Sequence, residues 1–188
     1  MTEVASAGPG RDAESGGVLI SVDDPGAEDV RALLETHLAF CHALTPIAHA
    51  YALDADRLSE PGVTFFSARA GGMLVGVGAL KRLDDSHAEL KSMHTSEAVR
   101  GRGVGRAMAG HILAFAREQG YRRVSLETGT MDAFAPARAL YARMGFEPCE
   151  PFGEYAPSPY NTWMTMSLDA RPPGSPDASH AAAPPMDD

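Results

Sequence analysis

The chain has 188 residues, 44% of them hydrophobic, and a formal net charge of −9. That length and apolar content fit one domain with a substantial core. The negative charge disfavours a partner with a phosphate backbone, since nucleic-acid binders carry basic faces, so no DNA or RNA partner is expected.

The cysteines, the apolar runs and the N-terminal residues disfavour metal-binding, disulfide-linked, membrane-spanning and secreted proteins. The two cysteines, Cys41 and Cys149, are far apart and form no CxxC pair, so neither a metal site nor a disulfide framework is expected. No apolar run approaches the ~20 residues that cross a bilayer. Residues 1–17 lack the basic start and apolar middle of a signal peptide. We therefore expect a cytoplasmic protein without a membrane partner.

Composition divides the chain into a domain and two tails. Residues 1–17 are rich in Gly, Ala and Ser, and residues 169–188 are rich in Pro and Ala, with hardly any large apolar side chains. Such segments bury too little apolar surface to fold, so both are expected to be disordered. The domain is expected over residues 18–168, without internal repeats.

The domain begins with a predicted strand and helix. Residues 18–22 are predicted to form a strand, and residues 27–44 a helix whose acidic first turn suits the helix dipole. Pro46 ends or restarts that helix. Residues 46–58 are expected to form a short helix or a loop.

Three strands follow. Residues 63–69, 73–83 and 87–95 are predicted to be strands, separated by a Gly-Gly turn and by a polar turn at residues 84–86. Consecutive strands with short turns predict an antiparallel meander.

The second half of the domain adds a crossover. Apolar residues recur at helical spacing over residues 103–119, and Gly120 supplies a stop. Residues 122–127 are predicted to form a strand, which makes strands 87–95 and 122–127 parallel with a right-handed connection. The remaining predicted elements are a short helix and two strands, over residues 136–144, 146–149 and 160–168. The fold class is therefore α/β (α+β) with a mixed sheet.

A glycine-rich segment stands between the strand at 87–95 and the helix that follows. Residues 100–106 read Arg-Gly-Arg-Gly-Val-Gly-Arg. Glycines let backbone N–H groups turn toward an anion, and the helix N-terminus adds the positive end of its dipole. An ordinary flexible, basic turn is the alternative, and the glycine spacings of Rossmann and P-loop sites are absent. The segment predicts a pyrophosphate site.

Two motifs resemble those of the GNAT superfamily of N-acetyltransferases. The loop motif (Q/R)xxGx(G/A) and the helix motif Leu-Tyr-x-x-x-Gly-Phe are matched by Arg100, Gly103, Gly105, Leu140, Tyr141, Gly145 and Phe146. Strings that contain Glu89, Glu127 and Asp132 are similar to the YsnE-like branch of small bacterial acetyltransferases. The resemblance covers residues 18–168.

The resemblance implies a mixed, mostly antiparallel sheet with flanking helices, whose parallel central pair splays to admit acetyl-CoA. Polar residues on strands 87–95 and 122–127 agree with a cleft, because inner strands covered on both faces are usually apolar. The residues implied to bind acetyl-CoA are Met93, His94, Thr95, Arg100, Gly101, Arg102, Gly103, Val104, Gly105, Arg106, Phe134, Ala137 and Tyr141. A backbone N–H near Met93 is expected to polarise the thioester carbonyl and stabilise the oxyanion. Many family members carry Asn at the position of Phe134, so any contact made by that Asn is replaced or missing.

Acetyl transfer to an amine needs a base for the amine proton and a proton for the departing thiolate. Glu89 is the first candidate base, Glu127 the second and His87 the third. The alternative is that either carboxylate only pairs with Lys91. Tyr141 matches the family's general acid, while core packing with a satisfied hydroxyl is its alternative role.

The acceptor pocket is expected to involve loops and strand ends with aromatic and charged side chains. Its candidate residues are His49, Tyr51, Lys91, Glu127, Asp132, Phe152 and Tyr155. Aromatic walls with acids suit a small cationic amine, although such loops also cover cores. Arg138 either caps a carboxylate of the acceptor or lies in solvent.

The leading hypothesis is an acetyl-CoA-dependent N-acetyltransferase that moves an acetyl group to a primary amine of a small molecule by direct attack in a ternary complex. A protein lysine or N-terminal acetyltransferase is one alternative. A non-catalytic acyl-CoA-binding module is another, disfavoured by Tyr141. The expected partners are acetyl-CoA and the amine, and a homodimer is left open.

Overall fold

The computed structural model describes residues 17–169, and the predicted tails lie outside these residues except for Gly17 and Asp169. The strands are β1 (Leu19–Val22), β2 (Val63–Ala70), β3 (Met73–Arg82), β4 (His87–Thr95), β5 (Arg123–Gly129), β6 (Glu147–Cys149) and β7 (Asn161–Ser167). The helices are α1 (Glu28–Leu44), α2 (Ala55–Leu58), α3 (Val104–Glu118) and α4 (Ala135–Arg143). Each strand and helix predicted from the sequence is present, with ends shifted by at most two residues.

The strands form one sheet in the order β1-β2-β3-β4-β5-β7-β6. All neighbours are antiparallel except β4 and β5, which are parallel because α3 carries the chain across the sheet between them. This confirms the mixed sheet and the crossover.

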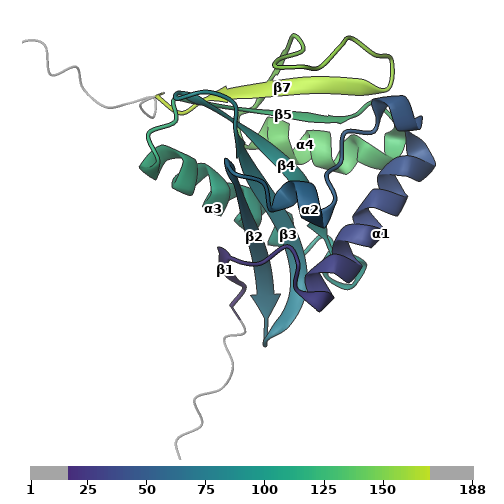
Figure 1. The fold of residues 1–188 in the computed structure, drawn as a ribbon, viewed down its shortest axis with the longest axis vertical. Helices are drawn as coiled ribbons and strands as arrows, with labels where there is room; N and C mark the ends of the chain where they lie inside the picture. Colours follow the sequence, from purple (N-terminus) through teal and green to yellow (C-terminus); the bar gives the residue numbers. More distant parts are fainter. Residues whose placement is uncertain (1–16, 170–188) are drawn as a thin grey trace, which may run out of the picture.

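Helices cover both faces of the sheet, with α1 and α2 on one and α3 and α4 on the other (Figure 1). Successive residues of β2 point to opposite faces. Phe65 packs in a cluster with Val30 and Leu34 of α1, while Phe66 packs in the larger cluster beneath α3.

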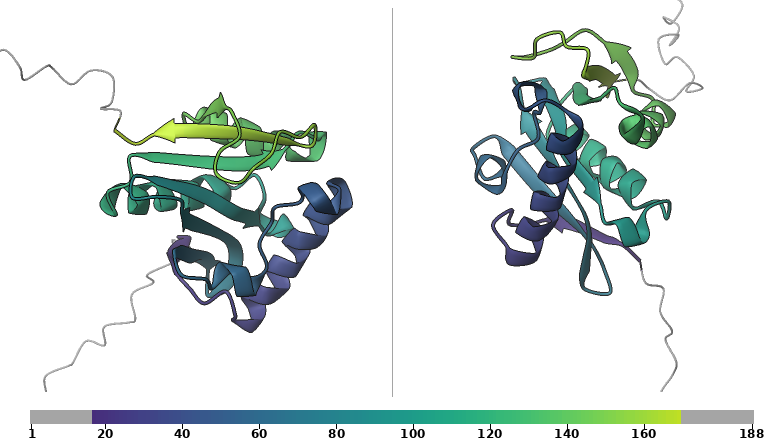
Figure 2. Two further views of the ribbon diagram at one scale, coloured as in Figure 1. Left: turned by 45° about the horizontal axis from the view of Figure 1, so that its top comes forward. Right: turned by 90° about the vertical axis from the view of Figure 1, so that its right-hand side faces the viewer.

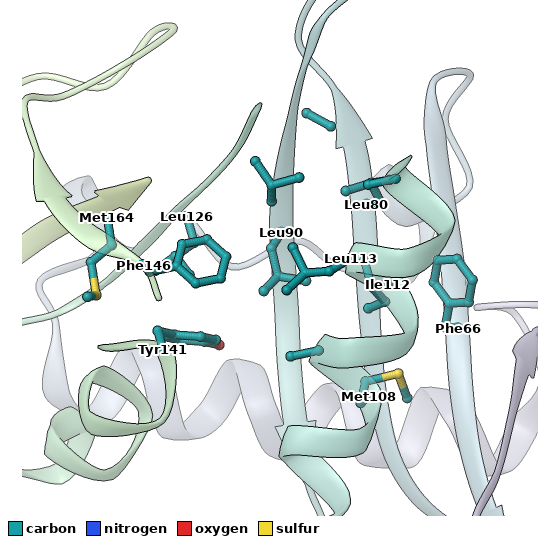
Figure 3. Packing of buried hydrophobic residues seen from close by; sticks show 14 of the residues in the cluster. Phe66, Leu80, Leu90, Met108, Ile112, Leu113, Leu126, Tyr141, Phe146 and Met164 are labelled. Carbon is teal, nitrogen blue, oxygen red and sulfur yellow. The ribbon is translucent and has the colours of Figure 1, made fainter. Parts of the chain in front are cut away.

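The predicted apolar stripe of α3 lies against the sheet. Val104, Met108 and Ile112 are buried at every fourth position, and the last two face β3 and β4 in Figure 3. The helix ends as expected at Gly120, whose φ of 86° is the left-handed conformation that glycine favours.

The parallel pair separates along its length. His87–Leu90 of β4 pairs with Arg123–Leu126 of β5, and the pairing stops there although both strands continue. Figure 1 shows β4 and β5 close together at their starts and diverging toward α1, and the left view of Figure 2 shows the same separation. The divergence confirms the splayed central pair.

A bulge on β4 marks the place where the strands part. Ser92 has a φ of 51°, and the register of β4 with β3 shifts there, so that Ser92 and Met93 lie opposite Gly78 alone. A Cβ atom on Gly78 would lie 2.6 Å from Met93 Sδ, so a larger residue beside the bulge would require the side chains packed there to shift.

The segment of uncertain structure at residues 46–58 contains two short elements. Ile47–His49 forms a 3-10 turn, η1, and α2 follows after a loop. Asp54 caps α2 by accepting a hydrogen bond from Arg57 N–H at 2.9 Å. Two further 3-10 turns, η2 (Glu97–Val99) and η3 (Asp132–Phe134), were not predicted, because one turn of chain carries no periodic pattern.

Candidate active site

A cavity of about 580 Å³ occupies the opening between β4 and β5. It is bordered by α1, the η1 segment, the start of α3, and α4. Most of the site residues predicted from the sequence line it: His49, Tyr51, Glu89, Lys91, Met93, His94, Thr95, Arg100, Gly101, Gly103, Val104, Gly105, Arg106, Glu127, Phe134, Ala137 and Tyr141. Arg102, Asp132, Phe152 and Tyr155 do not contribute to its lining.

One end of the cavity is the N-terminus of α3. The N-cap residue, Gly103, has a φ of 86°, no side chain caps the helix, and no acidic residue stands in its first turn. The first N–H groups of a helix lack intrahelical partners, so those of Gly103 to Arg106 remain available to an anion. The N–H of Arg102 is different, because it donates to the carbonyl of Val99 at 3.2 Å.

The glycine loop is held against β4 and α4. Arg100 Nε donates to the carbonyl of Thr95 at 3.2 Å, and Arg100 Nη1 lies 3.1 Å from Glu97 Oε1. A Cβ atom on Gly105 would lie 3.4 Å from Thr95 Oγ1 and 3.5 Å from Leu140 Cδ2. The helix start therefore sits close to the end of β4, where a larger residue has little room.

Glu89 is enclosed by two hydrogen-bond donors. It is 2% exposed, accepts from Lys91 Nζ at 3.0 Å, and accepts from the hydroxyl of Tyr155. Burial and the nearby Glu89 charge raise the pKa of Tyr155, which keeps its phenol protonated as a donor. The charge of Glu89 is thus balanced by Lys91, a pairing that the sequence left open as its alternative role.

Glu127 has a different environment on the neighbouring strand. Its Oε1 accepts from Asn161 Nδ2, a neutral amide. Burial raises the pKa of Glu127, while the Asn161 hydrogen bond and the Lys91 charge oppose that rise and Glu89 adds to it. A carboxylate with a raised pKa is better suited to accept a proton near neutral pH.

Tyr141 borders the cavity from α4. It is 6% exposed, and its ring packs edge-on against Phe146 at 5.7 Å between centroids. Figure 3 shows it beside Phe146 and below Leu126. Within residues 17–169 its hydroxyl has no protein hydrogen-bond partner. Burial, followed by the charge of Glu127, raises the pKa of Tyr141, so the phenol carries its proton at neutral pH.

His87, the third candidate base, belongs to a network outside the cavity lining. Its Nε2 lies 2.7 Å from Ser125 Oγ, which lies 2.8 Å from Thr165 Oγ1, and Arg123 Nη2 lies 3.0 Å from His87 Nδ1. Both ring nitrogens are therefore engaged with protein groups.

The aromatic residues of the acceptor region form a layer over Lys91. The rings of Tyr51 and Tyr155 meet edge to face at 4.7 Å, and Phe152 packs edge to face on Tyr155 at 5.2 Å. Lys91 Nζ lies 5.3 Å from the centroid of Tyr155. Tyr155 thus contacts both Lys91 and Glu89, and Phe152 packs on Tyr155.

Asp132 and Arg138, two further residues considered for contact with the acceptor, do not line the cavity. Asp132 is exposed at the start of η3. Arg138 is partly buried, and its Nη1 donates to the carbonyls of Gly129 at 2.6 Å and Met131 at 2.9 Å. Arg138 therefore holds the connection from β5 to α4.

Sequence reasoning missed seven polar residues that line the cavity: His37, Cys41, Thr45, Ser92, Thr128, Arg143 and Asn161. His37 and Cys41 share the buried stripe of α1 with Val30 and Leu34, so their spacing indicated only core positions. Burial lowers the pKa of His37 to about 4, with a smaller contribution from His94, whose ring centroid is 5.2 Å away. Burial raises the pKa of Cys41 to about 11, so this thiol stays protonated.

Two negative findings apply to residues 17–169. No helix in this range is long and apolar enough to cross a membrane. No group of three or more His, Cys, Asp or Glu side chains in the same range is arranged to hold a metal ion.

Comparison with known proteins gives a consistent picture. The sequence matches the profile of the acetyltransferase (GNAT) family over residues 30–146. It is 42% identical over 149 residues to the uncharacterized N-acetyltransferase YsnE of Bacillus subtilis, which covers 79% of this chain and 99% of that protein. This confirms the resemblance stated above.

Solved structures share the fold. A Klebsiella pneumoniae protein described as an acyl-CoA N-acyltransferase superposes with a TM-score of 0.69 at 24% identity, over 82% of this chain and 99% of the other. A GNAT family acetyltransferase from Elizabethkingia anophelis with acetyl-CoA bound gives a TM-score of 0.60 at 15% identity, over 82% and 99% of the two chains.

Proposed function

The chain belongs to the acetyltransferase (GNAT) family, and we propose that it transfers an acetyl group from acetyl-CoA to a primary amine of a small molecule. The observation that carries the proposal is the single cavity that joins the free amides at the start of α3 to Glu127 and Tyr141.

The residues present fit acetyl-CoA, which supplies an acetyl group activated as a thioester. The uncapped helix start at Gly103 offers N–H groups to a pyrophosphate. Beyond Leu90, β4 has no paired strand on its β5 side, which leaves its edge open to a pantetheine arm. The structural relative from Elizabethkingia anophelis carries acetyl-CoA.

Of the two carboxylates, the contacts favour Glu127 as the base. Glu89 already accepts hydrogen bonds from a lysine and a tyrosine, whereas Glu127 accepts from one neutral amide and has a raised pKa. A carboxylate that is not neutralised by a lysine can take the proton that the amine releases as its C–N bond forms.

Tyr141 supplies the second proton transfer. As the C–S bond breaks, its phenol donates a proton to the departing sulfur. Atoms balance in this scheme, because the amine loses one proton to Glu127 and the thiolate gains one from Tyr141.

A screen of acetyl-CoA turnover tests the proposal. Small primary amines, amino acids and polyamines are compared with peptides carrying a lysine or a free N-terminus, and release of free thiol is measured. Turnover with small amines well above that with peptides supports the proposal. Preference for the peptides would replace it with a protein acetyltransferase, and acetyl-CoA binding without any turnover would indicate a binding module.

A further inference from the structure

Asn161 has one unmet hydrogen-bonding atom at the cavity. The residue lies at the start of β7, lines the cavity and is 5% exposed. Its Nδ2 donates to the carbonyl oxygen of His49 at 3.0 Å and to Glu127 Oε1. Since both partners are acceptors, the carboxamide has one orientation, with Nδ2 toward them.

The remaining atom of the carboxamide, Oδ1, is buried and has no hydrogen-bond partner within residues 17–169. Buried acceptors nearly always have a donor. Because Asn161 lines the cavity beside Glu127, an N–H group of an amine bound there would supply a donor for this atom.

We propose that Asn161 is a specificity and positioning residue, which holds Glu127 through Nδ2 and selects primary amines through Oδ1. The inference rests on the proposed function and assigns its amine class to one side chain. Asn161 also connects the η1 segment to the proposed base, because its Nδ2 donates to both the His49 carbonyl and Glu127 Oε1.

The chemistry of acetyl transfer explains why a primary amine fits. A neutral primary amine carries two N–H bonds. As nitrogen bonds to the thioester carbon and the C–S bond breaks, one proton passes to Glu127 and the other stays on the amide product. The retained N–H donates to Asn161 Oδ1, whereas a secondary amine keeps no N–H and leaves Oδ1 unpaired.

Several groups act on Glu127 and therefore on any pH readout. Glu89 and Lys91 of β4 interact electrostatically with Glu127. In addition to burial, the charge of Glu127 raises the pKa values of Cys41 in α1, Tyr141 in α4 and Tyr155. These groups are unchanged in variants of Asn161. The Asn161 hydrogen bond lowers the pKa of Glu127, so its removal raises that pKa.

Two variants separate the two roles. Asn161→Leu removes both the donor and the acceptor, whereas Asn161→Asp replaces the donor to Glu127 with a second, negatively charged carboxylate and keeps an oxygen that can accept from the amine. Thr162→Val is the matched control, because Thr162 is the next residue of β7 and does not line the cavity. Acetyl-CoA affinity and melting temperature are measured for each protein.

The readouts are the ratio of kcat/KM for a primary amine to that for its N-methyl derivative, and the pH–rate profile. Benzylamine, ethanolamine and glycine are each paired with the N-methyl compound. In Asn161→Leu we expect the ratio to fall roughly 10-fold, the equivalent of one hydrogen bond. Asn161→Asp should keep the ratio. Both variants should lose activity at a higher pH than the parent as the solution is acidified.

An unchanged ratio in Asn161→Leu overturns the inference, because steric exclusion of the methyl group would then explain the preference. If that variant does not fold, Asn161→Ala, which also removes both the donor and the acceptor, takes its place, and an unchanged ratio in that variant overturns the inference. A parent protein that acetylates no amine at all contradicts the proposed function itself, which keeps the two failures distinct.

Discussion

Glu127 and Glu89 lie on neighbouring strands and line the same cavity, but they have different hydrogen-bond partners. We therefore expect Glu127 to act as the base and Glu89 to pair with Lys91. Glu127 must be deprotonated to act as a base, and burial raises its pKa. The turnover of the parent should therefore be lost, as pH falls, at a value above the ordinary pKa of a glutamate. Glu127→Gln should lower kcat roughly 10²- to 10⁴-fold and remove that acid limb. A pH–rate profile at saturating acetyl-CoA measures both effects, and a full rate in the variant would exclude Glu127 as the base.

Glu89→Gln is expected to act on stability more than on turnover per folded molecule. Lys91 is 9% exposed, and the substitution removes its counter-charge. Leaving one buried charge unpaired costs up to about 3–5 kcal/mol in the free energy of unfolding. The double variant Glu89→Gln, Lys91→Met should be more stable than the single variant, because no charge remains unpaired. Urea denaturation of the three proteins compares them, and equal midpoints for single variant and parent would contradict the pairing role.

Tyr141→Phe separates an acid from a packing residue. Phenylalanine keeps the ring that packs on Phe146, so folding and acetyl-CoA affinity should be preserved. If the phenol protonates the leaving thiolate, kcat should fall roughly 10²- to 10⁴-fold. A purely structural hydroxyl would instead shift stability by about 1 kcal/mol and leave turnover unchanged. Turnover and melting temperature measured on one sample distinguish the two roles.

At the level of elements, the proposed pyrophosphate site at the junction of β4 and α3 depends on backbone N–H groups. Gly105→Val places a branched side chain where even a Cβ atom would contact Thr95 and Leu140. It should weaken acetyl-CoA binding by roughly 10-fold or more, because charge-assisted hydrogen bonds to the phosphates are lost. Isothermal titration calorimetry with acetyl-CoA measures the change.

The matched control for that substitution lies in the same helix. Gly110 is exposed in the middle of α3, and no atom would lie within 4 Å of a Cβ atom there. Gly110→Ala should therefore stabilise the helix by about 1 kcal/mol and leave the affinity unchanged. An unchanged affinity in Gly105→Val as well would remove the pyrophosphate site from α3.

Helices and strands that show a regular pattern within their own sequence were predictable. Features that depend on pairing with a neighbouring strand were not. The stripe of α3 and the meander from β2 to β4 follow from periodicity and turn residues within each segment. The bulge at Ser92 and the two extra residues of β5 depend instead on the neighbouring strands. No single segment contains the information that sets them.

In the candidate site, too, residues in local sequence motifs were predictable, whereas contacts between distant segments were not. The glycine loop and Tyr141 belong to short motifs, so the sequence alone was enough to predict them as site residues. Asn161 and Glu127 meet across β5 and β7, 34 positions apart along the chain, and a polar residue in a strand gives no sign of such a partner. The choice between Glu89 and Glu127 likewise needed the positions of Lys91 and Tyr155.

Considered as a whole, the molecule has two sheet portions joined by a short seam. β1 to β4 form one portion and β5, β7 and β6 the other, and the ladder between β4 and β5 that joins them contains four residue pairs. Buried side chains such as Leu90 and Leu126 add apolar contact across the seam. A ligand in the cavity touches both portions, so its binding should stabilise their relative position.

Amide hydrogen exchange tests this bridging directly. With saturating acetyl-CoA, we expect slower exchange at Gly103–Arg106, the proposed pyrophosphate site, and along residues 91–95 of β4, the proposed path of the pantetheine arm. Exchange should also slow at residues 127–129 of β5, across the opening. Pyrophosphate alone is the matched control, since it can occupy the helix start but cannot span the strands, and it should protect residues 103–106 only. Protection by acetyl-CoA confined to residues 103–106 would mean that the opening between β4 and β5 does not receive the acyl-carrying arm. A uniform slowing over both portions would indicate global stabilisation instead of a bridge.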